Sequence, residues 1–124
     1  MLKLMILVVD DELHVRKSVL RLLASFGHAA TAVEGGREAL DFLLTCTPRL
    51  IVLDFNMPGI NGLGVLRAVR ADARLAALPV VMLTALDQND RPGEIASLGV
   101  ADWIVKASEG WAERLLEAAR RHAP

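Results

Sequence analysis

The sequence predicts an α/β domain in which five β-strands alternate with five α-helices around a parallel sheet. Four short apolar runs are rich in branched residues and contain no polar alternation, which is typical of strands covered on both faces. The segments between these runs carry apolar residues at helical spacing. In a chain of 124 residues, this alternation favours right-handed crossovers and one doubly wound domain.

The predicted strands are short and are bounded by polar or turn-forming residues. The second of them is smaller and less apolar than the others, so we expect it at an edge of the sheet. In chain order the five segments are LMILVV (4–9), AATAV (29–33), LIVL (50–53), VVML (80–83) and WIV (103–105).

The first two predicted helices each carry an apolar stripe that can cover the sheet. In the segment 13–27, Val19, Leu23 and Phe26 fall on one stripe, and Gly27 ends the helix. In the segment 37–44, Leu43 and Leu44 are predicted to share the buried face with the other apolar residues. The third helix, 62–70, follows the same pattern with its leucines and valines.

The fourth helix, within 90–99, is predicted to be the least stable. Pro92 is tolerated only in a first turn, and Gly93 costs about 1 kcal/mol relative to alanine inside a helix. The last helix, within 108–121, begins with Ser108 as its expected N-cap. It ends in Arg120 and Arg121, which suit the negative end of a helix.

Composition and charge exclude several classes of function. The formal net charge of −1 provides no broad positive field, so direct nucleic-acid binding is not expected. A single cysteine, Cys46, cannot form an internal disulfide, and no zinc-site spacing is present. The apolar start lacks a signal-peptide cleavage site, and no run reaches the roughly 20 residues of a membrane span. We therefore expect a cytoplasmic protein.

Polar residues follow four of the predicted strands. Asp10 and Asp11 follow the first strand, Asp54 the third, Thr84 the fourth and Lys106 the fifth. Because ligands of open α/β sheets bind beyond the carboxyl ends of the strands, these side chains are expected at one edge of the sheet.

Carboxylates that converge on one edge repel one another, and a hard divalent cation such as Mg²⁺ relieves that repulsion. The sequence offers too few ligands for a complete cage, so a phosphate group is expected to finish the site. Thr84 and Lys106 can then stabilise phosphoryl oxygens, and Asp54 is placed to act as the nucleophile. Lys106 could instead form a plain salt bridge. Glu12 could touch the water shell of the metal, or could serve only as a helix N-terminal carboxylate.

These segments together resemble the receiver domain of bacterial response regulators. The resemblance covers residues 1–124 and rests on VVDDE, LIVLDFNMPGINGL, PVVMLTA and LGVADWIVK in that order. It implies a flavodoxin-like (βα)5 fold with a five-stranded parallel sheet of order 2-1-3-4-5. Spacing alone does not predict that strand order.

The resemblance also implies roles for the residues of the site. Asp54 looks like the phosphoacceptor, and Asp10 and Asp11 look like the acidic pair that holds Mg²⁺, Asp11 directly and Asp10 through water. The backbone carbonyl of Asn56 would be a further metal ligand. Thr84 resembles the switch hydroxyl of the family.

Lys106 resembles the lysine that pairs with the phosphoryl group, but its surroundings depart from the family pattern. Ala107 replaces the usual proline, before which the peptide bond is often cis, so the loop is expected to run differently. Trp103 stands at the switch position that is normally Tyr or Phe, and its indole N–H needs a partner when it is buried. Pro92 and Gly93 fall in the helix that usually forms part of the signalling face.

The predicted function is a phosphoacceptor signalling module of a two-component phosphorelay. A sensor histidine kinase or a histidine phosphotransfer protein would phosphorylate Asp54, and an unidentified output protein would read the changed surface. The protein would be a monomer or a phosphorylation-dependent dimer, and not an enzyme beyond its own phosphorylation and dephosphorylation. One alternative is a phosphorylation-independent scaffold. The other is a Mg²⁺-dependent hydrolase, although Asn56 stands where such an enzyme needs a second acid.

Overall fold

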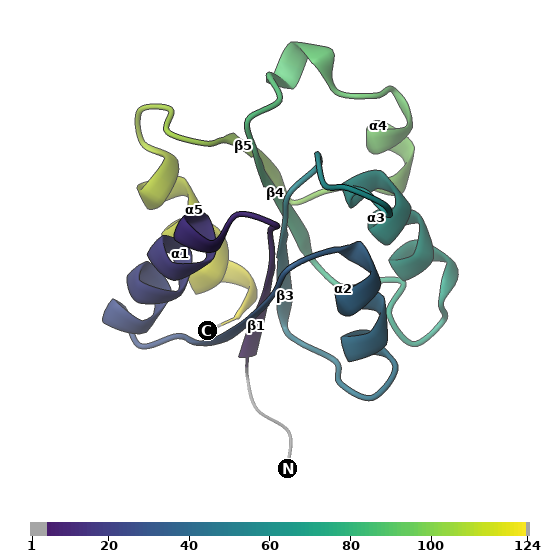
Figure 1. Ribbon diagram of the computed structural model, residues 1–124, viewed down its shortest axis with the longest axis horizontal. Helices are drawn as coiled ribbons and strands as arrows, with labels where there is room; N and C mark the ends of the chain where they lie inside the picture. Colours follow the sequence, from purple (N-terminus) through teal and green to yellow (C-terminus); the bar gives the residue numbers. More distant parts are fainter. Residues whose placement is uncertain (1–4, 124) are drawn as a thin grey trace.

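Five parallel strands form one sheet at the centre of the molecule (Figure 1). The computed structural model describes residues 5–123 of the chain. The strand order is β2-β1-β3-β4-β5, which confirms the predicted flavodoxin-like order 2-1-3-4-5. Residue 4 of the first predicted strand lies outside the described residues. The bounds are β1 (Met5–Val9), β2 (Ala29–Val33), β3 (Leu50–Leu53), β4 (Val80–Thr84) and β5 (Asp102–Val105).

Helices cover both faces of the sheet. In Figure 1, α1 and α5 lie on one side of the strands, and α2, α3 and α4 lie on the other. Within residues 5–123, no helix is long and apolar enough to cross a membrane. The bounds are α1 (Leu13–Ser25), α2 (Gly36–Leu43), α3 (Gly62–Ala71), α4 (Glu94–Leu98) and α5 (Trp111–His122), with a short 3-10 helix, η1 (Gln88–Asp90), before α4.

The two helical layers pack on separate hydrophobic cores, one on each face of the sheet. Along β3, Ile51 and Leu53 belong to the core under α2 and α3, whereas Leu50 and Val52 belong to the core under α1 and α5. Every residue of β3 and β4 is buried, because both faces are covered. The predicted edge position of 29–33 is confirmed, since β2 is partly exposed and is the terminal strand.

Two apolar residues predicted on buried stripes lie in solvent instead. Phe26 is 62% exposed because α1 ends at Ser25 and the backbone of Phe26 leaves the helical path before Gly27. Leu44 is 75% exposed. It follows the last residue of α2 and lies about 100° around the helix from the buried Leu43, at the flank of the apolar stripe.

The start of α5 also differs from the prediction. Ser108 does not cap the helix: its hydroxyl donates a hydrogen bond to the carbonyl of Val105 at 2.6 Å. The helix begins at Trp111, after Gly110, whose φ of 79° lies in the left-handed region. A residue without a side chain adopts that conformation at little cost, so Gly110 rather than Ser108 sets the first residue of α5.

The helix α4 is only five residues long, and an arginine of α3 closes its C-terminal end. The guanidinium of Arg70 donates to the carbonyls of Leu98 and Gly99 at 2.7 and 2.9 Å. It also donates to the carbonyls of Ala76 and Leu78 at 3.2 and 2.7 Å, in the loop before β4. One cation therefore satisfies carbonyl groups that a short helix end and a turn would otherwise leave without donors.

We expect Arg70→Met to lower the free energy of unfolding by about 2–4 kcal/mol, because it removes charge-assisted hydrogen bonds and leaves part-buried carbonyls unpaired. Urea unfolding followed by circular dichroism measures this loss. Arg67→Met is the matched control, because Arg67 pairs with Glu94 at the exposed N-terminal end of α4. An equal loss in both variants would contradict the assigned role of Arg70.

Candidate functional site

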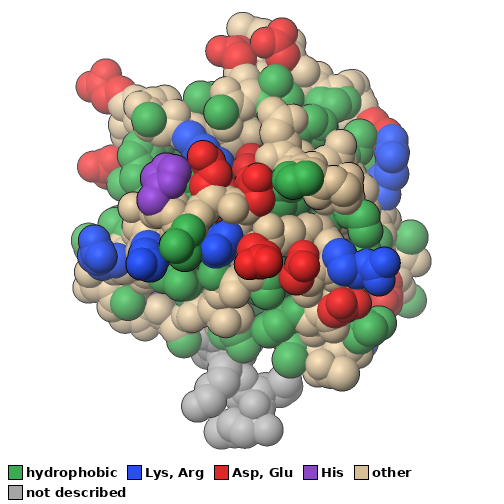
Figure 2. Space-filling model, in the orientation of Figure 1, with side chains coloured by type: hydrophobic (Ala, Val, Ile, Leu, Met, Phe, Trp, Pro, Cys, Tyr) green, Lys and Arg blue, Asp and Glu red, His purple; other side chains and the backbone are tan. Residues whose placement is uncertain are grey.

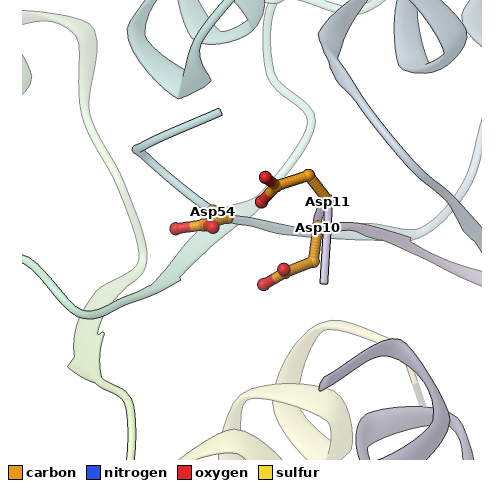
Figure 3. A group of neighbouring side chains, drawn as sticks. All are labelled: Asp10, Asp11 and Asp54. Atoms are coloured by element: carbon orange, nitrogen blue, oxygen red, sulfur yellow. The ribbon is translucent and has the colours of Figure 1, made fainter. Parts of the chain in front are cut away.

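Three carboxylates meet at the carboxyl ends of β1 and β3. Asp10 and Asp11 follow β1 and Asp54 follows β3, as Figure 3 shows. One oxygen of each lies within 4.8 Å of the others. Asp10 and Asp54 are buried, whereas Asp11 is exposed. The cluster therefore has a buried floor and one solvent-facing carboxylate, and its hard oxygen donors suit a hard divalent cation.

The ammonium of Lys106 lies against this cluster from the end of β5. Its Nζ is 2.8 Å from an oxygen of Asp10 and 3.2 Å from an oxygen of Asp54. It is also 3.2 Å from an oxygen of Glu12. The backbone N–H of Lys106 donates to the carbonyl of Thr84 at 2.8 Å, which holds the residue at the end of the sheet. The predicted convergence of Asp10, Asp54 and Lys106 is thus observed.

The pKa values of Asp54 and Lys106 are both raised, for different reasons. Burial raises the pKa of the Asp54 carboxyl and the charge of Asp10 raises it further, against the opposing effect of Lys106 and Thr84. Burial alone would lower the pKa of the Lys106 ammonium, but hydrogen bonds and charges from Asp10, Asp54 and Glu12 outweigh it. Lys106 therefore stays charged, and the ionised form of Asp54 is disfavoured by a repulsion that a bound cation would relieve.

The loop after β3 holds Asp54 close to the start of α3. The backbone N–H of Asp54 donates to the carbonyl of Val9 at 2.9 Å, and Gly62 N–H donates to the carbonyl of Phe55 at 2.8 Å. A Cβ on Gly62 would lie 2.4 Å from the carbonyl oxygen of Asp54, so only glycine permits this approach. Asn61 caps α3 by accepting from Gly64 N–H at 3.0 Å.

A chain of hydrogen bonds connects Thr84 to Trp103. The Thr84 hydroxyl accepts from Leu86 N–H at 3.3 Å, and the Leu86 carbonyl accepts from the Trp103 indole N–H at 3.0 Å. Thr84 and Trp103 are both buried. The Trp103 ring lies 5.9 Å, centroid to centroid, from that of Phe55, the residue after Asp54. Trp103 is therefore linked to the site through two neighbours.

The remaining predicted residues of the site have different outcomes. Asn56 is exposed two residues beyond Asp54, and the part played by its backbone carbonyl stays a prediction. Among residues 5–123 no peptide bond is cis, so the bond before Ala107 is trans. Ala107 has a φ of 60°, a conformation that few residues other than glycine adopt. The loop after Lys106 therefore turns through a left-handed residue.

Sequence reasoning missed several contacts that shape the site. The backbone N–H of Glu12 donates to Asp10 at 2.9 Å, and Arg16 donates to the carbonyl of Asp10 at 2.7 Å. The ion pair between Glu12 and Lys106 joins residues 94 positions apart in the chain. The Arg16 contact was within reach of sequence reasoning, because Arg16 lies in the first turn of α1, six residues after Asp10. The Lys106 pairing depends on the tertiary fold.

One face of the molecule carries both signs of charge. On the face shown in Figure 2, acidic and basic side chains are interspersed and hydrophobic side chains lie between them. Neither sign dominates this face, in keeping with the formal net charge of −1. The absence of direct nucleic-acid binding stays a prediction.

The fold and the site together define a class of protein: a parallel α/β sheet of order 2-1-3-4-5 with an acidic pocket and a lysine at its carboxyl edge. The family model described as the response regulator receiver domain matches residues 6–120. The chain belongs to this family, whose members act in two-component signalling.

Several known proteins are similar to this chain. The chemotaxis protein CheY of Pseudomonas aeruginosa is 43% identical over 102 residues, which cover 82% of each chain. The structure of CheY4 of Vibrio cholerae has a TM-score of 0.84 at 30% identity, covering 95% of this chain and 97% of that one. The response regulator TrrA of Thermotoga maritima, solved in complex with Mg²⁺ and beryllium fluoride, has a TM-score of 0.82 at 28% identity, with coverage of 96% and 98%.

We expect Asp54→Asn to raise the melting temperature at pH 7 without divalent cations. Because the pKa of Asp54 is raised above its ordinary value of 3.8, its ionised form costs folding free energy at neutral pH. That cost disappears once the carboxyl is protonated in both states, so the gain should shrink as the pH falls toward 3.8.

Thermal unfolding at a series of pH values measures this gain. Asp41→Asn, at an exposed position of α2, is the matched control and should leave the melting temperature nearly unchanged. A lower melting temperature for Asp54→Asn at pH 7 would show that the pairing with Lys106 outweighs burial and repulsion.

Proposed function

We propose that Asp54 accepts a phosphoryl group from a phosphohistidine of a sensor histidine kinase or a histidine phosphotransfer protein. The observation that carries this proposal is the approach of Lys106 to Asp54 at 3.2 Å, beside the acidic pair Asp10 and Asp11. A buried nucleophilic carboxylate, a fixed cation and a cluster suited to a divalent metal are what phosphoryl transfer requires.

In the proposed reaction, an oxygen of Asp54 attacks the phosphorus atom in line with the bond to the histidine nitrogen. The P–O bond to Asp54 forms while the P–N bond breaks, and the imidazole leaves with the electron pair. The ammonium of Lys106 and the hydroxyl of Thr84 would donate hydrogen bonds to the phosphoryl oxygens. The backbones of both residues are already fixed in the sheet, so only their side-chain contacts have to change when the phosphoryl group arrives.

The same carboxylates would hold Mg²⁺. Asp11 and Asp54 would supply oxygen ligands directly, Asp10 would do so through water, and the carbonyl of Asn56 would be a further ligand. Their hard oxygen donors and short mutual distances fit this metal. Mg²⁺ would neutralise charge on the phosphoryl group and on the crowded carboxylates. The binding of Mg²⁺ and beryllium fluoride by TrrA is in keeping with this assignment.

The output would be a change in the surface formed by α4, β5 and α5, read by a partner protein. Thr84 and Trp103 would be the switch residues, because the hydroxyl of Thr84 is tied through Leu86 to the indole of Trp103. We propose that the protein works in the cytoplasm, as a monomer or as a dimer that forms on phosphorylation. Apart from phosphorylation and dephosphorylation of Asp54, we assign it no enzymatic activity.

Two other functions are weaker. A phosphorylation-independent scaffold would explain Ala107 and Trp103, the departures near Lys106, but not the retained acidic cluster. A Mg²⁺-dependent phosphohydrolase would use the same nucleophile, but the residue two positions beyond Asp54 is Asn56 rather than an acid. Failure to turn over a small phosphate ester would exclude the hydrolase.

Incubation with acetyl phosphate and Mg²⁺ should add one phosphoryl group to the wild-type protein, as measured by intact mass. Chelation of the metal should suppress the adduct, because the carboxylates then repel the anionic donor. Asp54→Asn should abolish it, whereas Asp87→Asn, which changes an exposed carboxylate before η1, should not. An adduct that persists in Asp54→Asn would contradict the proposed acceptor.

Trp103 should report occupation of the site. In a Trp111→Phe variant, Trp103 is the remaining indole, and its fluorescence should change when beryllium fluoride and Mg²⁺ are added. The change should be lost on Thr84→Val, because the hydroxyl contact to Leu86 is removed. The reciprocal variant Trp103→Phe, which keeps Trp111, is the control. An equal change in both single-tryptophan proteins would contradict a specific link to Trp103.

A further inference from the structure

The ammonium of Lys106 is enclosed by three carboxylates: it donates hydrogen bonds to Glu12 and Asp54, each at 3.2 Å, and forms an ion pair with Asp10 at 2.8 Å. It carries three N–H groups and lies within 3.2 Å of three carboxylates, those of Asp10, Glu12 and Asp54. A phosphoryl oxygen on Asp54 needs a donor from the same ammonium. One of the three existing partners must therefore yield its place.

The three partners differ in how easily they can be released. The side chains of Asp10 and Asp54 are 3% and 5% exposed, so water cannot readily take the place of Lys106 around either carboxylate. The side chain of Glu12 is 50% exposed, so water can take the place of Lys106 around its carboxylate. Glu12 is therefore the partner that leaves at the smallest cost in free energy.

The carboxylate of Glu12 has no other structural task among the described residues. Glu12 occupies the N-cap position of α1, yet its side chain makes no capping hydrogen bond. The backbone of Glu12 makes the local hydrogen bonds: its N–H donates to Asp10, and its carbonyl accepts from the N–H groups of Val15 and Arg16. The side chain is directed instead to Lys106 at 3.2 Å.

We propose that Glu12 is a positioning residue that occupies the donor of Lys106 until a phosphoryl oxygen displaces it. This inference rests on the proposed phosphorylation of Asp54 and adds a residue that sets how readily the site accepts the group. Glu12 acts through Lys106 and makes no contact with the reacting atoms. Its carboxylate competes with the phosphoryl group, so its removal strengthens phosphoryl binding.

Two substitutions separate pairing from simple charge repulsion. Glu12→Gln keeps the length of the side chain and removes its charge, whereas Glu12→Asp keeps the charge and shortens the reach by one methylene group. If Glu12 acted only by repelling the anionic ligand, Glu12→Gln would change the binding affinity and Glu12→Asp would not. Loss of the pairing with Lys106 responds to both, so both variants should bind the phosphoryl analogue more tightly than the wild type.

Isothermal titration calorimetry with beryllium fluoride at saturating Mg²⁺ provides the test. We expect Glu12→Gln to lower the dissociation constant by about 2- to 5-fold, the range for a part-exposed ion pair. Glu12→Asp should change it in the same direction by a smaller factor. Glu34→Gln, an exposed acid just beyond the end of β2 on the same edge of the sheet, is the matched control and should leave it unchanged. In a Lys106→Met background, Glu12→Gln should have no further effect.

Several results would overturn the proposal: weaker binding by Glu12→Gln, an equal effect of Glu34→Gln, a wild-type value for Glu12→Asp, or an effect that persists without Lys106. In each of these cases phosphorylation of Asp54 in the wild type still stands. A wild-type protein that neither binds beryllium fluoride nor is phosphorylated at Asp54 would overturn the proposed function, and the role of Glu12 with it.

Discussion

The repulsion among carboxylates at the ends of β1 and β3 is the constraint on which the site depends. Asp10 and Asp54 are buried side by side, where ionised groups are poorly hydrated. The only opposite charge that the described residues bring to both is Lys106, at the end of β5, which is three strands from β1 and two from β3. This pairing lowers the cost of the buried charges without removing it, since the pKa of Asp54 remains raised. The site is therefore prepared to gain free energy from an added cation.

The sheet holds the backbone of the site in place despite the free-energy cost of the buried carboxylates. Asp54 and Lys106 are each held by a backbone hydrogen bond to a neighbouring strand, at 2.9 and 2.8 Å, so the backbone of Asp54 stays beside Asp10 and that of Lys106 stays beside both. Motion is left to the exposed rim, where Glu12 and Asp11 lie. Asp10 and Asp54 are buried and fixed, whereas Asp11 and Glu12 are exposed. An anion that enters the site should therefore change the contacts of the exposed residues first.

The sequence was informative where local pattern decides the outcome. The apolar run 50–53 was predicted to be a strand covered on both faces, and every residue of it is buried. Gly27 was predicted to end the first helix, and its φ of 83° lies in the left-handed region that glycine favours there. Both predictions are confirmed. The site residues could be placed because parallel strands end at one edge. The role of Ser108 was wrong because Gly110 can begin the helix later, and the pairing of Glu12 with Lys106 was missed because it spans 94 residues. Contacts of that kind depend on strand order, which local pattern does not encode.

Trp103, which stands where the family usually has Tyr or Phe, makes an outward rotation of this side chain more costly. Its indole is buried and its N–H is satisfied by Leu86, so turning it outward would cost a hydrogen bond and expose a large apolar surface. Its backbone carbonyl accepts from Arg114 of α5 at 3.1 Å. Contacts alone do not establish coupling, which requires an element with two arrangements. The Thr84 side chain would provide one if donation of its O–H to a phosphoryl oxygen on Asp54 drew the hydroxyl away from Leu86 N–H, from which it accepts in this structure.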